Sequence, residues 1–191
     1  MEVRVLVVCT GNVCRSPIAE QVLRARLAAA GVDATVSSAG TAALVGAPMT
    51  EEAAARSRRL GGDPSGHIAV EVTAEMLRDV DLVLTATRAH RAAVARLEPR
   101  AIRRSFTLLE FSRLAAAGAA EPVDGFVEYV AAVAAARGIV PPPLEPADDD
   151  IVDPYGRGPG IYDVAASLID RAVDQVVRAL AAVPLGRTGV R

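Results

Sequence analysis

The sequence predicts an α/β fold in which helices flank a parallel β-sheet. Short aliphatic runs, the first of them at residues 3–8, have the nearly unbroken apolar character of strands buried on both faces of a parallel sheet. Longer segments with apolar residues at helical spacing lie between these runs. The length of 191 residues and the hydrophobic fraction of 51% suit one domain with an ample core.

Each element follows from a local pattern. After the first strand, a helix is expected over residues 16–30, because Pro17 occupies a first-turn position, apolar residues recur along the segment and Gly31 ends it. The next elements, in chain order, are a strand at 34–38, helices at 50–60 and 73–80, a strand at 81–85, a helix at 88–97 and a fourth strand at 102–107.

The carboxyl-terminal part is expected to contain two more helices. An amphipathic helix fits residues 123–137, with Phe126, Val127, Val130 and Val133 on its apolar face, and a triple proline then forms a semi-rigid arm at 141–143. A last helix over 162–183 should pack on the sheet through Val164, Leu168, Ile169, Val173, Val176, Val177 and Leu180. We expect a single domain over residues 1–183 and a flexible tail over 184–191.

The turn between the first strand and the first helix has the most specific chemistry. It reads Val-Cys-Thr-Gly-Asn-Val-Cys-Arg-Ser-Pro and lies at the amino end of a helix, where backbone N–H groups and the helix dipole attract an anion. Gly11 and Asn12 can adopt positive φ values, which let successive N–H groups turn inward. Cys9 at the floor of such a nest is expected to be a stabilised thiolate nucleophile, and Arg15 offers a planar fork to two phosphate oxygens. The pattern therefore predicts a phosphate-binding active site.

The same residues indicate a reaction. A thiolate attacks a phosphate monoester only when the equatorial oxygens are neutralised, which Arg15 and the N–H groups of residues 11–16 would do, while Ser16 hydrogen-bonds the sulfur. The product is a phosphocysteine, and the leaving oxygen needs a proton. Asp153 is the best placed acid, because the proline after it stiffens its loop, and it would then activate water. The other local carboxylates, which we expect to be solvated surface charge, are Asp149 and Asp150.

These motifs resemble the low-molecular-weight protein tyrosine phosphatases, whose loop reads Cys-x-Gly-Asn-x-Cys-Arg-Ser-Pro and whose general acid lies in an Asp-Pro-aromatic motif. Here that second motif is Asp153-Pro154-Tyr155, and residues 38–41, 66–67 and 81–85 resemble the middle of the family. The resemblance extends from residue 3 to about residue 180. It implies a three-layer fold with a four-stranded sheet of strand order 2-1-3-4 and a site at the carboxyl edge.

The resemblance also implies roles for further residues. The substrate-binding residues would be Thr10, Gly11, Asn12, Val13, Cys14, Ser16 and Tyr155, with Val13, Tyr155 and Leu44 as the walls of a phosphotyrosine slot. Asn12, Ser16, Ser38 and His67 would form a hydrogen-bond network that holds the loop, with His67 structural rather than an acid or base. Val70 stands where the family often has arginine, so a contact at the substrate edge is missing.

Several alternatives stay open. Cys14 is either a partner for a regulatory disulfide with Cys9 or an ordinary apolar pocket thiol.

Phosphotyrosine is favoured over phosphoarginine, since the branch that acts on phosphoarginine has threonine where this chain has Val13. The arsenate reductases of the same family need two further cysteines, which this chain lacks. An alternative outside the enzymes is a catalytically weak phosphopeptide-binding module. Asp153 argues against it, because a binder needs no general acid.

Composition narrows the class of protein. The net charge of −2 favours no nucleic-acid partner, and no apolar stretch approaches the length of a membrane span. The strand begins at once after Glu2, which leaves no room for a signal peptide, and two cysteines point to a reducing compartment. We therefore expect a cytoplasmic enzyme without metal or cofactor, a monomer or weak dimer that acts on a phosphotyrosine protein or peptide. The chain contains arginine but no lysine, which indicates a GC-rich genome. Together with the resemblance, this composition indicates a bacterial family member of actinobacterial type.

The segment at residues 113–147 is the main departure from the family, which usually needs fewer residues before its Asp-Pro motif. We interpret this segment as an insertion. Surface padding is the favoured reading, and a specificity element near the pocket is the alternative.

Overall fold

The sheet has the predicted topology. The structure, a computed structural model, describes residues 2–118 and 125–183. Its four strands are all parallel and run in the order β2-β1-β3-β4, which confirms the predicted order 2-1-3-4. The strands are β1 (Val3–Cys9), β2 (Ala34–Gly40), β3 (Leu82–Thr85) and β4 (Ser105–Thr107).

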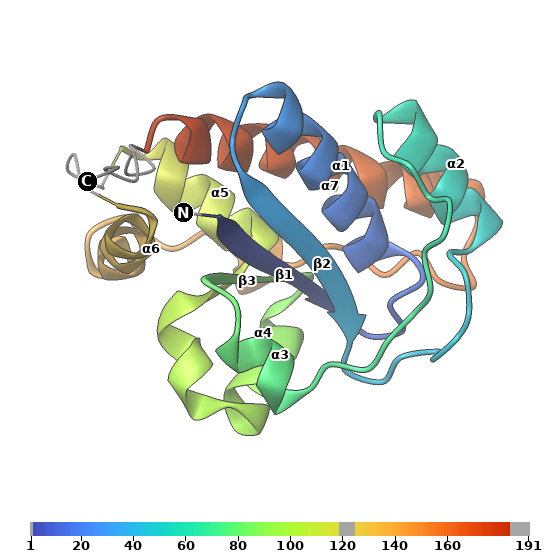
Figure 1. The fold of residues 1–191 in the computed structure, drawn as a ribbon, viewed down its shortest axis with the longest axis horizontal. Helices are drawn as coiled ribbons and strands as arrows, with labels where there is room; N and C mark the ends of the chain where they lie inside the picture. The colour runs from blue at the N-terminus through green and yellow to red at the C-terminus, as the bar shows by residue number, and fades with distance from the viewer. Residues whose placement is uncertain (1, 119–124, 184–191) are drawn as a thin grey trace, which may run out of the picture.

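Helices cover both faces of the sheet, which gives the three predicted layers (Figure 1). One face is covered by α1 (Arg15–Ala29), α2 (Glu51–Arg59), α5 (Leu108–Ala116) and α7 (Pro159–Ala181). The other is covered by α3 (Ala74–Arg78), α4 (Arg88–Leu97) and the 3-10 helix η1 (Pro99–Arg104).

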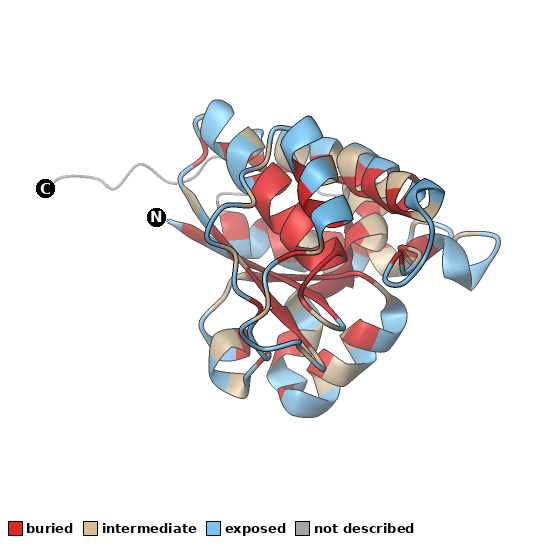
Figure 2. Cartoon of the chain, turned by 90° about the vertical axis from the view of Figure 1, so that its right-hand side faces the viewer, coloured by how far each residue is buried: buried red, intermediate tan, exposed pale blue. Residues whose placement is uncertain are grey.

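Alternation along β1 divides the core between these layers. Val5 and Val7 belong to the cluster on the α1 and α7 side, whereas Leu6 and Val8 belong to the cluster on the α3 and α4 side. All four are 2% exposed or less, and burial of each such side chain stabilises the fold by about 1.5–3 kcal/mol. In Figure 2 the strands are mostly red, because both faces of the sheet are covered; the exceptions are Arg4 of β1 and Ala34, Thr35 and Ser37 of β2.

Threonine side chains cap the amino ends of four helices. The hydroxyls of Thr50, Thr73 and Thr87 accept hydrogen bonds from the third residue of α2, α3 and α4. Thr107 and Glu110 form a reciprocal capping box at the start of α5. The helices predicted over 16–30, 50–60, 73–80 and 88–97 are confirmed to within two residues at each end. The helix α5 was not predicted, although its Thr-x-x-Glu signal is present in the sequence.

The predicted fourth strand is wrong in its first half. Residues 102–104 belong to η1, where Pro99 starts a tight turn and the Glu98 carboxylate accepts a hydrogen bond from the backbone of Arg100. Arg103 and Arg104 could not be placed in a strand buried on both faces without a large desolvation cost. The strand therefore begins only at Ser105.

Two predicted helix faces also need correction. In the helix predicted over 123–137, residues 123–124 lie outside the described range, and the observed elements are α6 (Phe126–Ala135) and the 3-10 helix η2 (Ala136–Gly138). Val127 is 53% exposed, and Tyr129 is buried in its place. In α7, Val164 is 50% exposed and the alanines after it are buried. The tail predicted over 184–191 lies outside the described residues.

A further 3-10 helix, η3 (Pro146–Asp149), leads into the Asp-Pro motif. The helix α6 packs against η1 and α5, and Figure 1 shows it apart from the sheet, to one side of it. Among the described residues, no helix combines the length and the apolar character needed to cross a membrane.

Candidate active site

Three segments of chain meet at the carboxyl edge of the sheet and enclose a small pocket. Its volume is about 150 Å³. The loop after β1 supplies most of the wall, the loop after β2 adds two apolar residues, and the Asp-Pro motif closes one side. The lining residues are Cys9, Thr10, Gly11, Val13, Cys14, Arg15, Ala42, Leu44, Asp153 and Tyr155. Of the predicted site residues, Asn12, Ser16, Ser38 and His67 lie behind this wall instead.

The backbone of the loop after β1 turns its carbonyls away from the pocket. The segment after β2 donates to three of them: the N–H groups of Thr41, Ala42 and Leu44 reach the carbonyl oxygens of residues 9, 10 and 11 at 2.9, 3.1 and 3.0 Å. The N–H of Thr50 reaches the carbonyl of Val13 at 3.0 Å. By contrast, the N–H groups of residues 11–14 donate to no other residue that the structure describes. Such a set of unpaired donors at a helix start has the arrangement of an anion-binding nest.

Close packing of the two strand ends keeps this loop in place. Cys9 pairs with Gly40 across β1 and β2. A Cβ atom at Gly40 would lie 2.2 Å from the carbonyl oxygen of Thr10, so no larger residue fits without moving the loop.

Asn12 makes the turn that reverses the loop. Its φ is +56°, and it is the one non-glycine residue with positive φ in the described chain, whereas Gly11 has no positive φ, contrary to expectation. The Nδ2 group donates to Ser16 Oγ at 2.9 Å and to Ser38 Oγ at 2.8 Å. Its Oδ1 accepts from the N–H of Val70 at 2.9 Å. These bonds offset the cost of about 1–2 kcal/mol of a left-handed residue.

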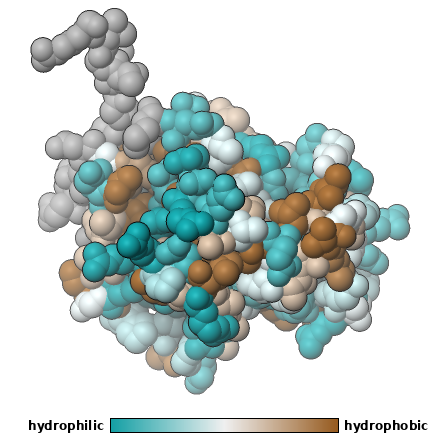
Figure 3. Space-filling view, turned by 60° about the horizontal axis from the view of Figure 1, so that its bottom comes forward, coloured by the Kyte–Doolittle hydropathy of each residue, from teal (hydrophilic) through white to brown (hydrophobic). Residues whose placement is uncertain are grey.

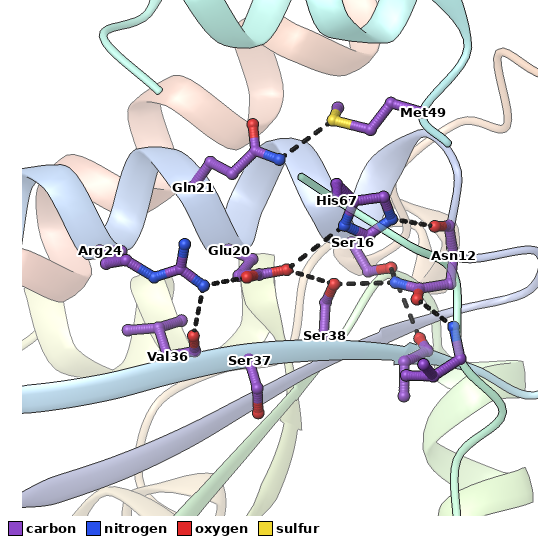
Figure 4. A network of polar contacts seen from close by, with 12 residues as sticks. Asn12, Ser16, Glu20, Gln21, Arg24, Val36, Ser37, Ser38, Met49 and His67 are labelled. Atoms are coloured by element: carbon purple, nitrogen blue, oxygen red, sulfur yellow. Dashed lines mark hydrogen bonds and ion pairs between the residues drawn. The ribbon is translucent and has the colours of Figure 1, made fainter. Parts of the chain in front are cut away.

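The network extends behind the loop to a glutamate (Figure 4). His67 Nε2 lies 2.7 Å from the carbonyl oxygen of Asn12, and its Nδ1 lies 4.0 Å from a carboxylate oxygen of Glu20. The Ser38 hydroxyl donates to the same carboxylate, which also pairs with Arg24. Glu20 was not predicted as part of the site, although its position four residues after Ser16 places both on the same helix face.

Cys9 and Ser16 are in direct contact. The Sγ and Oγ atoms lie 3.0 Å apart, and both side chains are buried. A hydroxyl in this position can donate to a thiolate. Neither Cys9 nor Cys14 is in a disulfide.

Arg15 joins the loop to the Asp-Pro motif. Although it is 5% exposed, its Nη2 pairs with Asp153 Oδ2 at 2.7 Å and its Nη1 donates to the carbonyl of Ile151 at 3.2 Å. Its Nε is buried and has no partner among the described residues. The side chain of Asp153 is 53% exposed and accepts a hydrogen bond from the N–H of Tyr155 at 3.2 Å.

His90 supports the pocket from α4 and was not predicted. Its Nε2 lies 2.8 Å from Thr10 Oγ1, and its Nδ1 lies 2.7 Å from Thr87 Oγ1. The Thr10 hydroxyl in turn lies 3.4 Å from Arg15 Nη2. Burial, with the nearby charge of Arg15, lowers the pKa of His90 from 6.5 to about 4. The imidazole is therefore neutral near pH 7 and positions Thr10 without adding charge.

Cys14 has its own polar surroundings. Its Sγ lies 3.5 Å from Thr50 Oγ1 and 3.8 Å from the hydroxyl of Tyr162. Burial raises the pKa of this thiol despite both contacts. Cys14 is therefore held as a neutral thiol at the wall of the pocket.

The aspartates before the Asp-Pro motif are not solvated surface charge, contrary to expectation. Asp149 pairs with Arg113 at 2.9 Å and Asp150 pairs with Arg88 at 3.0 Å. Asp150 Oδ1 also accepts from the N–H of Arg88 at 2.7 Å, at the start of α4. Both carboxylates anchor the chain that leads to Asp153, and neither lines the pocket.

Known proteins are similar to this chain in sequence and fold. The profile of the family described as low molecular weight phosphotyrosine protein phosphatase matches residues 4–138. The phosphatase Etp of Escherichia coli is 45% identical over 95 residues, which are 50% of this chain and 62% of Etp. The probable phosphatase AmsI of Erwinia amylovora is 39% identical over 95 residues, which are 50% of this chain and 63% of AmsI. The matched segments thus span less than two thirds of these relatives.

Solved structures cover more of the chain. The crystal structure of the AmsI tyrosine phosphatase has a TM-score of 0.70 at 25% identity and covers 98% of this chain and 95% of its own. The Wzb protein of Vibrio vulnificus has a TM-score of 0.68 at 25% identity, with 92% and 97% covered. Because the family profile matches well over half of the chain, the protein belongs to the low molecular weight phosphotyrosine protein phosphatase family.

Proposed function

We propose that the protein is a protein tyrosine phosphatase that hydrolyses phosphate monoesters through a phosphocysteine on Cys9. The observation that carries this proposal is the placement of Cys9, Arg15 and Asp153 around one pocket whose backbone N–H groups are unpaired. A nucleophile, an anion cradle and an acid are the three groups that the reaction needs.

The first step transfers the phosphoryl group to sulfur. The N–H groups of residues 11–14 and the Arg15 guanidinium, with its unpaired Nε, neutralise the equatorial oxygens. The thiolate of Cys9 forms the S–P bond as the P–O bond to the phenol breaks. The incoming phosphate displaces Asp153 from Arg15, and Asp153, which takes up a proton from water as this ion pair breaks, gives that proton to the leaving oxygen.

The second step regenerates the enzyme. The Asp153 carboxylate takes a proton from water, whose oxygen bonds to phosphorus while the S–P bond breaks and inorganic phosphate forms. The hydroxyl of Ser16, 3.0 Å from the sulfur, stabilises the departing thiolate. The exposure of Asp153 supports this role, because water must reach its carboxylate.

The apolar walls of the pocket favour an aromatic ester. Val13, Leu44 and Tyr155 line its mouth, and the last two are 44% and 56% exposed. The Vibrio vulnificus Wzb structure is described as a complex with benzylphosphonate, which joins an aromatic ring to a phosphonate. The physiological substrate that we propose is a phosphotyrosine protein or peptide.

Two other activities are alternatives to this proposal. A structure of a YwlE arginine phosphatase has the same fold, with a TM-score of 0.71 at 23% identity, so the fold does not separate phosphoarginine from phosphotyrosine. Val13 favours phosphotyrosine. A phosphopeptide binder without turnover is disfavoured by Asp153.

Steady-state assays with p-nitrophenyl phosphate, a phosphotyrosine peptide and a phosphoarginine peptide test the proposal. We expect the phosphotyrosine peptide to have the higher kcat/KM of the two peptides. Cys9→Ser should lower turnover at least about 1,000-fold, because a hydroxyl without a base is a poor nucleophile, while phosphate still binds. Residual activity within tenfold of the wild type would rule out Cys9 as the nucleophile, and a preference for phosphoarginine would establish the alternative activity.

A further inference from the structure

A second and larger cavity lies away from the active-site pocket. It is a groove of about 640 Å³ between α6 and the elements that follow β3, and it shares no lining residue with the pocket around Cys9. Arg4 near the start of β1 and Asp81 before β3 place it toward the amino ends of the strands. The active site lies at their carboxyl ends. We call this cavity the arginine groove, after the side chains that dominate its wall.

Seven arginines and one carboxylate, Asp81, line the arginine groove. This density of positive charge is local, since the whole chain has a net charge of −2. The guanidiniums come from β1, α3, α4, η1 and η2, which are distant in sequence. Seven like charges in one cavity repel one another, and a bound anion would relieve that repulsion.

Some of these arginines have structural partners. Arg137 pairs with Glu110 at 2.7 Å and stacks over the Phe106 ring at 4.2 Å. Arg91 donates to the carbonyl of Ser105 at 2.8 Å, and both its burial and the charge of Arg137 lower its pKa. These two side chains form the fixed back of the groove, held too firmly to turn to other ligands.

Arg78 lies 4.0 Å from a carboxylate oxygen of Glu98, and the other four arginines have donors to spare. Arg4, Arg100 and Arg103 are exposed, and no carboxylate lies within ion-pair distance of them in the described chain. Arg104 donates to the carbonyl of Leu77 at 2.7 Å, but its Nε is buried without a partner. A buried guanidinium N–H without a partner is unfavourable, and an anion in the groove would supply the missing acceptor.

The opposite wall is apolar. It consists of Val127, Val130, Ala131 and Ala134 on α6, with Ile102 and Val80 at its base. Val127 is 53% exposed and Val130 is buried beneath it. Figure 3, which brings this side of the molecule forward, shows apolar side chains among a dense field of hydrophilic ones. A ligand that fills the groove therefore needs several anionic groups and one flat or apolar part.

We propose that the arginine groove binds a nucleoside polyphosphate, with the phosphates on the η1 arginines and the base against α6. Guanidinium forks match phosphate oxygens bidentately, and several linked phosphates satisfy several arginines at once. The volume lies within the range of about 300–1,000 Å³ that is typical of small-molecule sites. The site is independent of the active-site chemistry, because it shares none of its residues.

Isothermal titration calorimetry with ATP, in EDTA and at constant ionic strength, tests this proposal. We expect one site, weakened at least tenfold in the double variant Arg100→Glu/Arg103→Glu, since both side chains are exposed and their reversal leaves the fold intact. The matched control is Arg58→Glu/Arg96→Glu, which reverses two exposed arginines outside the groove and should change the affinity less than twofold. Circular dichroism confirms folding of each variant. No binding at 1 mM ATP, or equal weakening in both double variants, would overturn the proposal.

Two further measurements separate the ligand classes. Val127→Ser should weaken ATP about threefold and leave inorganic triphosphate unchanged, because only the base contacts α6. Equal affinity for ATP and triphosphate, or tighter binding of a single-stranded oligonucleotide or an acidic peptide, would contradict a nucleoside polyphosphate as the ligand. Arg15→Ala, which removes the guanidinium of the active-site pocket, should leave ATP binding unchanged; its loss would place ATP in that pocket and overturn the proposal.

Discussion

The loop after β1 and the segment that carries Asp153 differ in how they are held. Residues 12–16 of the loop are buried, although Thr10 is exposed, and the loop's carbonyls and its asparagine side chain have partners in β2, the segment after it and α1. The acid segment is tied down before the acid itself, where Asp149 and Asp150 pair with arginines, and it is exposed at Asp153 and Tyr155. The comparison separates a preorganised anion cradle from an acid that must exchange protons with water.

The largest effect on turnover is expected for a substitution that removes the acid of the exposed segment. Asp153→Asn should lower kcat by roughly two to four orders of magnitude on esters with poor leaving groups, and less on activated aryl phosphates that leave without a proton. Phenyl phosphate and p-nitrophenyl phosphate are suitable substrates for steady-state kinetics. An equal loss on both would mean that Asp153 acts only through its ion pair with Arg15.

A second prediction concerns the network behind the rigid loop. Ser38 bonds both Asn12 and Glu20, so Ser38→Ala should lower the free energy of unfolding by about 1–3 kcal/mol and kcat/KM about tenfold. The neighbouring Ser37→Ala is the control, because Ser37 Oγ makes one long contact of 3.5 Å to the carbonyl of Val5. Urea unfolding and kinetics compare the two. If both variants behaved alike, the network would not hold the loop.

The role of His90, which supports the pocket from α4, can be tested through the pH dependence of the free energy of unfolding. The unfolded chain protonates His90 below its ordinary pKa of 6.5, whereas the folded protein does so only below about 4. Stability is therefore lost as pH falls from 6.5 toward 4, by on the order of 2 kcal/mol after allowance for partial solvation. His90→Gln should remove this part of the pH dependence in urea unfolding between pH 4 and 7. An unchanged slope would show that another group titrates.

The smallest effect expected under standard assay conditions concerns the second thiol of the loop. Peroxide oxidation of Cys9 to a sulfenic acid, followed by attack of the Cys14 thiol with loss of water, would give a disulfide that a reductant reverses. Cys14→Ser should leave turnover nearly unchanged but make inactivation by peroxide largely irreversible. Recovery by dithiothreitol measures this, and equal recovery in both proteins would identify Cys14 as a packing residue.

The described part of the segment at 113–147 helps to distinguish its two interpretations, surface padding and a specificity element near the pocket. None of its described residues lines the active-site pocket, which agrees with the reading as padding rather than as a specificity element over that pocket. The same segment supplies α6 and Arg137 to the arginine groove. If the segment has a role in binding, the groove is where the structure supports it.

The sequence by itself determined the structural features that depend on residues close together in the chain. The buried strands, the strand-to-helix turn with Cys9 and Arg15, and most helix boundaries follow from runs, caps and breakers that act within a few residues. The resemblance added the strand order and supported Asp153 as the candidate acid. The failures were also local: residues 102–104 were predicted as strand but belong to η1, and the helix α5 with its capping box was not predicted.

Only the tertiary structure decided which polar groups meet. Glu20 and His90 look like ordinary helix residues in the sequence, and they became parts of the site because packing placed Glu20 beside Ser38 of β2 and His90 beside Thr10 of the loop after β1. The pairing of Asp149 and Asp150 with arginines 36 and 62 residues away, and the gathering of seven arginines in one groove, have the same origin. Electrostatic and hydrogen-bond partners depend on distances in space, which local patterns do not encode.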